Sequence, residues 1–244
     1  RVAAGGHVER KSRGLRVAGE VERALAAGFE AAEIVFTSDL FDRAALECLA
    51  RRRVRVNLGS ADMLEQYAAL GIGREVMLRV NPGFGAGHSS GVTTGGEHSK
   101  HGIWHARLDE ALLRARKVGL EVSGLHVHVG SGASVEGLAA AARALGELAT
   151  RVGRPLRTIS AGGGIPVPYR PEEPRPDLAR LAREWRAVHE GLERELDHAL
   201  DLELEPGRYL VAEAGVLLTE VRATKRSGAS NFALVDAGFH NLPR

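Results

Sequence analysis

Short β-branched runs alternate with longer helical stretches along most of the chain, and this alternation constrains the fold more than any other feature. Val and Ile favour strands, and the stretches between the runs repeat apolar residues at helical spacing. Six strands are expected before Arg208, at AEIVFTS, VRVNLGS, EVMLRVNPG, EVSGLHVHVGSG, LRTISAGGG and DLELEPGR. One of the helices expected between them, DLFDRAALECLARRR, has Asp39 near its start. Because parallel neighbours need long connections, the alternation predicts a parallel sheet with helical crossovers.

The predicted fold is an α/β barrel of the (β/α)8 TIM type that is incomplete at its N-terminus. A closed barrel of this type has eight strands, and six are expected here with DLELEPGR as the last, so the first two strands are expected to be missing. After Gly215 the sequence reads as strand, turn and strand without a helix. We therefore expect a barrel domain over residues 1–214 and the beginning of a C-terminal β-sheet domain over residues 215–244.

The composition excludes several classes of protein. The net charge is only +2, and no basic run is interleaved with aromatic residues, so nucleic-acid binding has no support. No apolar stretch approaches the roughly 20 residues of a membrane span, and the start of the chain lacks the apolar core of a secretory signal. Cys48 is the single cysteine, which excludes an internal disulfide and fits a reducing compartment. A cytoplasmic location is expected.

Two neighbouring strand ends carry residues that suit an anion. In barrels of this type the site lies at the carboxyl ends of the strands, and phosphate often binds after the last two. Gly162, Gly163 and Gly164 follow the fifth expected strand, and Gly207 and Arg208 follow the sixth. Glycine lets backbone N–H groups approach an anion without a Cβ clash, and arginine adds a positive charge. A plain turn at the triple glycine is the alternative, and the paired location favours a phosphate site.

Two pairs of titratable side chains share strand faces. His126 and His128 lie two residues apart and should point into the barrel, because side chains alternate along a strand. They can be metal ligands, a buried structural pair, or a histidine packed on a flat ligand. No cysteine pair or HExxH motif accompanies them, so no metal site is predicted. Glu203 and Glu205 likewise share one face, which is either exposed to solvent or turned to the interior of a barrel.

Several segments resemble the diaminopimelate decarboxylases in sequence and in order. They are GLHVHVGSG, SAGGGIPVPY, ELEPGRYLVAEAGVLL and LVDAGFHNLPR, together with LRVNPGFGAGHSSGVTTGGEHSKHGIW. The resemblance runs from about Gly19 to Arg244. It implies a fold-type III pyridoxal-phosphate enzyme with an alanine-racemase-like barrel. The implied reaction is decarboxylation of meso-2,6-diaminopimelate to L-lysine and CO2, the last step of lysine biosynthesis.

The resemblance also implies roles for individual residues. His128 would stack on the pyridoxal ring, and Glu205 would pair with the pyridine nitrogen, where a racemase is expected to have arginine. The resemblance assigns no role to Glu203, which its place on the strand puts deeper in the barrel, where we expect it in an ion pair. Lys100 falls where relatives place a lysine near the site. The remaining cofactor-binding residues would be Ser131, Gly162, Gly163, Gly164, Pro206, Gly207 and Arg208. Substrate carboxylates would be bound by Arg208 and Arg244, since planar guanidinium groups suit that task.

Two catalytic residues of the family have no match in the chain. No stretch resembles FAxKA, which carries the Schiff-base lysine, and Lys11 has no strand around it. The cysteine donated by the partner subunit would lie beyond Arg244, whereas Cys48 is expected in the core. We therefore expect an internal, inactive fragment of an enzyme that is homodimeric at full length. The alternatives are a decarboxylase of another amino acid, such as ornithine or lysine, and a non-catalytic pyridoxal-phosphate-binding protein.

Overall fold

The structure is a computed structural model that describes residues 2–4, 17–88, 90–238 and 240–241. Contacts between Cα atoms divide the chain into two units, Arg1–Tyr209 and Leu210–Arg244, which are described separately. None of the described helices is long and apolar enough to cross a membrane.

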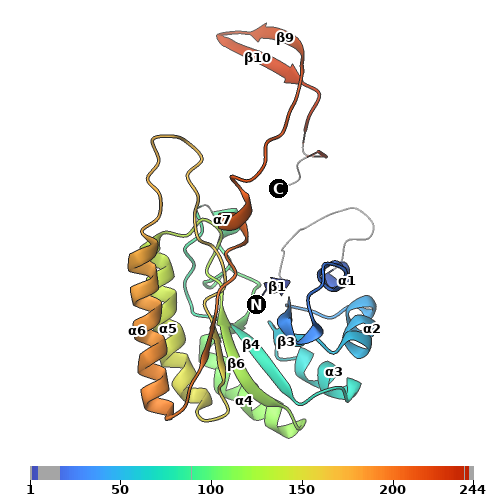
Figure 1. The fold of residues 1–244 in the computed structure, drawn as a ribbon, viewed down its shortest axis with the longest axis vertical. Coiled ribbons are helices and arrows are strands. Elements are labelled where there is room, and N and C mark those ends of the chain that lie inside the picture. The colour runs from blue at the N-terminus through green and yellow to red at the C-terminus, as the bar shows by residue number, and fades with distance from the viewer. Residues whose placement is uncertain (1, 5–16, 89, 239, 242–244) are drawn as a thin grey trace. The chain divides into compact units, whose positions relative to one another are not determined.

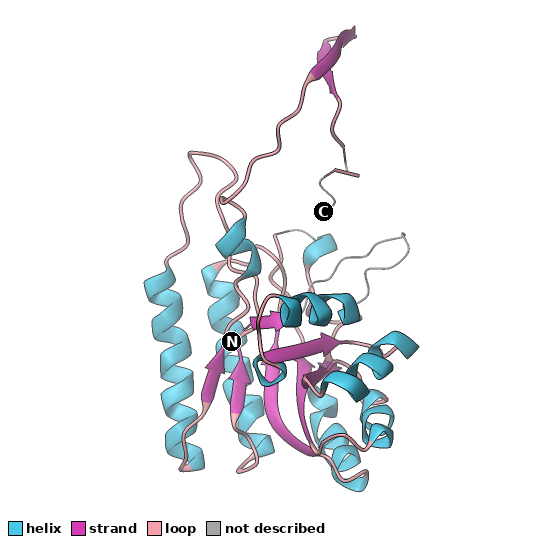
Figure 2. Cartoon of the chain, turned by 45° about the vertical axis from the view of Figure 1, so that its right-hand side comes forward, coloured by secondary structure: helices cyan, strands magenta, loops and turns pink. Residues whose placement is uncertain are grey.

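Unit 1 is built on a curved parallel sheet (Figures 1 and 2) whose strands follow the order β1-β2-β3-β4-β6-β7-β8. The strands are β1 (Val2–Ala4), β2 (Ile34–Ser38), β3 (Arg55–Leu58), β4 (Glu75–Asn81), β6 (Glu121–Val127), β7 (Thr158–Ser160) and β8 (Asp201–Glu203). A short strand, β5 (Ile103–Trp104), pairs with the end of β4. The predicted α/β fold is therefore confirmed: the parallel sheet curves as part of a barrel.

Helices connect the strands and lie along the outside of the sheet (Figure 2). They are α1 (Val17–Ala26), α2 (Arg43–Arg52), α3 (Met63–Leu70), α4 (Leu108–Lys117), α5 (Val135–Val152) and α6 (Leu178–Leu196), with short turns η1 (Ala31–Glu33), η2 (Ser90–Val92) and η3 (His105–Arg107). Local sequence fixes several ends: the side chains of Asp42, Ser134 and Asp177 cap α2, α5 and α6 by accepting backbone N–H groups. Helix α2 thus begins after Asp42, which leaves Asp39 in the loop that follows β2.

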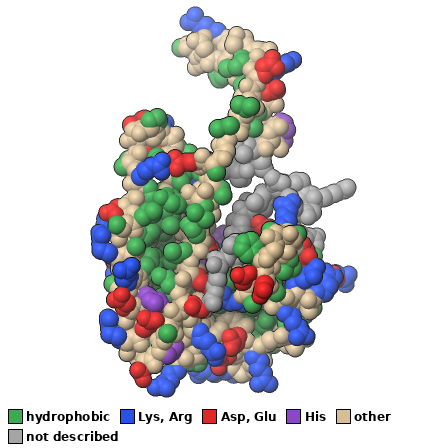
Figure 3. Space-filling view, in the orientation of Figure 1, with side chains coloured by type: hydrophobic (Ala, Val, Ile, Leu, Met, Phe, Trp, Pro, Cys, Tyr) green, Lys and Arg blue, Asp and Glu red, His purple; other side chains and the backbone are tan. Residues whose placement is uncertain are grey.

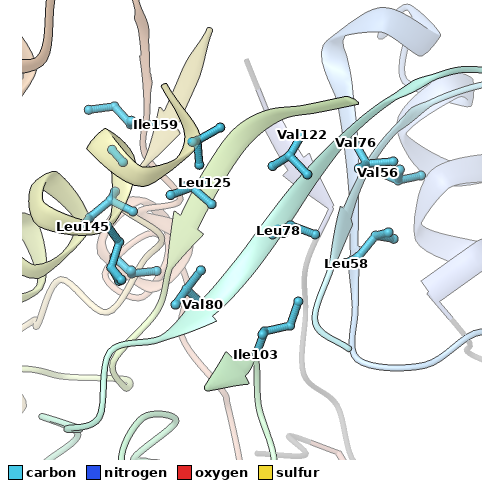
Figure 4. Close-up of a cluster of buried hydrophobic side chains, with 14 of the residues drawn as sticks. Val56, Leu58, Val76, Leu78, Val80, Ile103, Val122, Leu125, Leu145 and Ile159 are labelled. Carbon is cyan, nitrogen blue, oxygen red and sulfur yellow. The ribbon is translucent and has the colours of Figure 1, made fainter. Parts of the chain in front are cut away.

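The hydrophobic core lies between the sheet and its helices. Leu78 of β4, Leu125 of β6, Ile159 of β7 and Leu145 of α5 belong to one cluster of buried hydrophobic side chains (Figure 4). Cys48 of α2 is part of this core, as expected. Because side chains alternate along each strand, the neighbours of these core residues face the interior of the curve.

One feature of the sheet differs from the sequence-based expectation. Residues Val2–Ala4 form β1, parallel to β2 with Val2 opposite Ile34, so the expectation that both strands ahead of β2 are missing was wrong for one of them. Val-Ala-Ala carries no β-branched pattern, and a three-residue edge strand is held by backbone pairing that leaves little trace in sequence. Among the described strands, β1 and β8 end the sheet without pairing to each other.

The sheet is exposed beside β8. Leu204 faces away from the interior and is exposed. On the face drawn in Figure 3, hydrophobic side chains gather next to α5 and α6, on the flank where β8 ends the sheet.

Unit 2 contains an antiparallel hairpin of β9 (Val221–Ser227) and β10 (Ser230–Val235). The short helix α7 (Gly207–Val211) spans the division between the units. A strand, turn and strand were expected here, and Gly228 provides the turn with a φ of 58°. That residues 215–244 begin a separate β-sheet domain stays a prediction.

Candidate functional site

Inward-facing polar side chains occupy one row across four neighbouring strands. Arg79 of β4 is opposite His126 of β6, which is followed by Ser160 of β7 and Glu203 of β8 in the same register. The two glutamate side chains on the inner face are largely buried, with exposures of 10% for Glu203 and 16% for Glu205. The two glutamates therefore do not lie on a solvent-exposed face, and they point into the interior of the curved sheet.

Glu205 lies directly after β8, at the carboxyl edge of the sheet. Its backbone N–H donates to the carbonyl of Gly162 over 2.8 Å, and its Oε1 lies 3.2 Å from Nε2 of His126. Burial favours the protonated carboxyl, but His126, His128 and Arg79 outweigh burial and lower the pKa of Glu205 to about 2. The residue is therefore an anion at neutral pH.

His128 is held one residue beyond β6. Its Nδ1 accepts a hydrogen bond from the backbone N–H of Gly163 over 3.0 Å, which fixes the plane of the ring. Burial, followed by the positive charge of Arg79, lowers the pKa of His128 to about 3, so the ring is neutral. The rings of His126 and His128 are parallel to within 8°, with centroids 6.4 Å apart. A neutral imidazole fixed in this way suits packing against another flat ring.

The triple glycine packs tightly between the ends of β6 and β8. Gly162 and Gly164 have positive φ angles of 62° and 96°. A Cβ atom on Gly162, Gly163 or Gly164 would overlap the carbonyl oxygen of Val127, Glu205 or Gly130, respectively. Only glycine fits this turn, which brings the ends of β6, β7 and β8 together. The N–H of Gly163 is already bonded to His128, so it is not free for an anion while that bond is present.

The other expected site residues surround the same edge. The N–H of Ser131 donates to the carbonyl of Val92 over 3.1 Å, and its carbonyl accepts from the N–H of His88. Pro206 and Gly207 lead from Glu205 into α7. Arg208 is half-buried there, and its Nη1 is a buried atom without a hydrogen-bond partner among the described residues. Arg244 lies outside the described residues.

Sequence reasoning missed a charged network inside the sheet. Asp39 accepts from the N–H of Gly102 over 3.0 Å, is bonded to Nδ1 of His101, and lies 3.7 Å from Nη1 of Arg79. Burial opposes ionisation of Asp39, but His101, Arg79 and the Gly102 N–H lower its pKa to about 2. The sequence offered one signal for this network, because Asp39 directly follows an expected strand. The same position also suits an aspartate near the start of a helix, which is how the sequence was interpreted.

A second missed residue pairs with Glu203 deeper in the sheet. Arg55 of β3 places its Nη1 2.5 Å from Oε1 of Glu203, and its Nη2 lies 3.4 Å from the hydroxyl of Thr158. The expected ion pair of Glu203 is thus confirmed, and it joins β3 to β8 across the interior. Lys100 is exposed in the loop that precedes β5. In the part of the chain that the structure describes, no group of three His, Cys, Asp or Glu residues is placed to hold a metal ion.

Comparison with known proteins identifies relatives of the chain. The family model described as "Pyridoxal-dependent decarboxylase, pyridoxal binding domain" matches residues 14–212. The diaminopimelate decarboxylase of Streptomyces coelicolor is 48% identical over 230 residues, which cover 93% of this chain and 52% of that protein. The enzyme of the same name from Escherichia coli K12 is 46% identical, with 93% and 55% covered. The chain thus spans about half the length of the curated relatives it matches.

Solved structures agree with the sequence relatives. A crystal structure of a diaminopimelate decarboxylase superposes with a TM-score of 0.85 at 46% identity, covering 93% of this chain and 55% of that one. The diaminopimelate decarboxylase of Helicobacter pylori, solved in complex with L-lysine, has a TM-score of 0.80 at 31% identity, with 91% and 57% covered.

Proposed function

The chain belongs to the family of pyridoxal-dependent decarboxylases, and on that premise we propose that the protein decarboxylates meso-2,6-diaminopimelate to L-lysine and CO2. The observation that carries the proposal is Glu205, a carboxylate held ionised at the end of β8, against a turn where only glycine fits. The named relatives at 46–48% identity support the choice of substrate.

The residues at the carboxyl edge fit pyridoxal 5'-phosphate by their chemistry. The buried Nη1 of Arg208 has no partner among the described residues, which suits an anionic group. The turn at Gly162–Gly164 has no Cβ atoms, so an anionic group can approach its backbone closely. The fixed, neutral ring of His128 suits contact with a pyridine ring, and the anionic Glu205 suits a protonated pyridine nitrogen. We assign the phosphate to the glycine turn, Ser131 and the backbone of Gly207 and Arg208, which leaves the Arg208 guanidinium for a carboxylate of the substrate.

The chain's own residues then divide the work of the reaction. Pyridoxal phosphate, when bound, supplies an acceptor for the electron pair that remains as CO2 departs. Glu205 holds the proton at the pyridine nitrogen, because a carboxylate with a pKa of about 2 does not take that proton away. His128 would pack against the pyridine ring. Arg208 and Arg244 bind carboxylates of the substrate.

Substrate preference tests the proposal. Diaminopimelate has a distal carboxylate that lysine and ornithine lack, and a site built to pair that group leaves its arginine unpaired with the shorter analogues. In the complete protein we expect kcat/KM for meso-diaminopimelate to exceed that for L-lysine and L-ornithine by at least about 100-fold. Comparable values for lysine or ornithine would instead indicate a decarboxylase of that amino acid. Cofactor binding without CO2 release from any of the three would indicate a non-catalytic protein.

We also propose that the protein acts as a homodimer in the cytoplasm. The resemblance to the family supports the dimer, and the buried free thiol of Cys48 suits a reducing compartment. Light scattering of the complete protein tests the dimer: a mass of one chain at micromolar concentration would contradict it.

A further inference from the structure

His126 is almost fully buried at the site, and the proposed function gives it no role. Its side chain is 1% exposed, yet neither ring nitrogen makes a hydrogen bond to a described residue. Buried polar atoms nearly always have partners, and the exceptions gather where a protein needs them for function. The nearest charged group is Glu205, whose Oε1 lies 3.2 Å from Nε2 of the ring. The distance suits a hydrogen bond.

The position of Glu205 determines which nitrogen of His126 carries a proton. A neutral imidazole has one N–H and one lone pair. With the proton on Nδ1, the lone pair of Nε2 would face a carboxylate oxygen at 3.2 Å and repel it. With the proton on Nε2, the same contact becomes an N–H directed at an anion. The carboxylate therefore selects the form of His126 that donates toward Glu205.

The surroundings of Glu205 leave His126 as the group placed to hold one of its oxygens. Arg79 is directed to Asp39, with 3.7 Å between Nη1 and Oδ2. His128 uses Nδ1 to accept from Gly163 and carries no charge at neutral pH. His126 is the residue with a ring nitrogen within hydrogen-bond distance of the Glu205 carboxylate. The side chain of Glu205 nevertheless remains 16% exposed, so a ligand at the edge of the sheet can reach it.

We propose that His126 is a positioning residue for Glu205: its Nε2–H fixes one carboxylate oxygen, so that the carboxylate stays in place to pair with a protonated pyridine nitrogen. The inference rests on the proposed function, since it assigns Glu205 to that nitrogen. His126 itself touches neither the substrate nor the cofactor in this arrangement.

The test compares two ligands in the complete protein. One is pyridoxal 5'-phosphate, and the other is its 1-deaza analogue, in which CH replaces the pyridine nitrogen. Dissociation constants of both are measured by fluorescence titration for the unmodified protein, His126→Leu and His126→Gln. Leucine removes the N–H at similar volume, whereas the glutamine amide can still donate to Glu205. His189→Leu on α6 is the control, because it removes a ring bonded to the Leu200 carbonyl and reports the effect of lost stability alone.

We define the preference as the dissociation constant of the 1-deaza analogue divided by that of pyridoxal 5'-phosphate. We expect the same preference, greater than one, in the unmodified protein and in His189→Leu. In His126→Leu that preference should shrink by at least about 10-fold, which is the loss of one charge-assisted hydrogen bond, and His126→Gln should recover most of it. An unchanged preference in His126→Leu, or an equal loss of affinity for both ligands, would overturn the inference. Absence of any preference in the unmodified protein would instead contradict the placing of Glu205 at the ring nitrogen, and with it the proposed site.

Discussion

The carboxylate of Glu205 lies where burial alone would favour its protonated form. His126, His128 and Arg79 reverse that preference and lower its pKa to about 2. The sequence could place Glu205 on the inner face, because the two-residue period of a strand fixes which side chains share a face. It could not assign the charge, since Arg79 and His126 belong to β4 and β6 and reach Glu205 only in the folded sheet.

Replacing Glu205 should lower the turnover of the substrate without preventing the binding of the cofactor. In the complete protein, we expect Glu205→Gln to retain pyridoxal phosphate but to lower kcat by at least about 100-fold, because a neutral amide no longer holds the proton at the pyridine nitrogen. Cofactor content is measured by absorbance and turnover by CO2 release. Glu190→Gln, an exposed position on α6, is the matched control and should leave both unchanged. Near-normal turnover in Glu205→Gln would refute the assigned role.

The buried neutral state of His128 should make stability depend on pH. Burial and the charge of Arg79 lower the pKa of His128 from 6.5 to about 3. Below about pH 6.5 the unfolded chain takes up a proton at this residue and the folded chain does not, so stability is present above that pH and is lost as the pH falls toward 3. The carboxyls of Asp39 and Glu205, with lowered pKa values of about 2, add no loss above about pH 5.

We therefore expect the melting temperature of the unmodified protein to fall between about pH 7 and about pH 5, and that of His128→Gln to fall less over the same range. Calorimetry at several pH values measures both slopes. Equal slopes in the two proteins would contradict a buried, neutral His128.

At the scale of elements, the turn between β7 and the following segment should tolerate no side chain. A Cβ atom on Gly163 would overlap the Glu205 carbonyl and approach the His128 ring to 3.3 Å. We expect Gly163→Ala to destabilise the protein by about 1–3 kcal/mol and to weaken pyridoxal phosphate binding. Gly191→Ala is the control, because that glycine lies inside α6 with no heavy atom closer than 4.0 Å to its Cβ position. It should stabilise by about 0.5–1 kcal/mol. Urea unfolding measures both, and equal effects would contradict the packing.

The ion pair between β3 and β8 should contribute to stability only when both of its charges are present. Arg55 and Glu203 meet at 2.5 Å with side-chain exposures of 28% and 10%. Removing one partner leaves the other charge poorly solvated, so Arg55→Met and Glu203→Met should each cost about 1–3 kcal/mol. The double variant Arg55→Met with Glu203→Met should recover part of that loss, because no charge is left unpaired. A double variant as unstable as the sum of the single ones would show that the residues act independently.

The sequence was most informative where a pattern repeats and least where one residue acts alone. Alternation predicted the parallel sheet and placed His126, His128, Glu203 and Glu205 on the inner face. The strand β1 was missed because Val-Ala-Ala has no repeat to detect. Asp39 was missed as a site residue because its partners, Arg79 and His101, follow β3 in the chain and meet it only through the curvature of the sheet.

At the scale of the whole molecule, the site residues from Ser131 to Arg208 all belong to unit 1. Parallel strands end at the same edge, so residues distant in sequence gather there. The family match over residues 14–212 covers this same region as a pyridoxal-binding domain. We infer that unit 1 holds the cofactor.

A crystal structure of the complete protein with bound pyridoxal 5'-phosphate would test this arrangement of the site. We expect the phosphate at the turn of Gly162–Gly164 and near Arg208, the pyridine ring against His128, and the ring nitrogen about 2.6–3.2 Å from the Glu205 carboxylate. Binding of the phosphate elsewhere, or a ring nitrogen without Glu205 beside it, would contradict the proposed site.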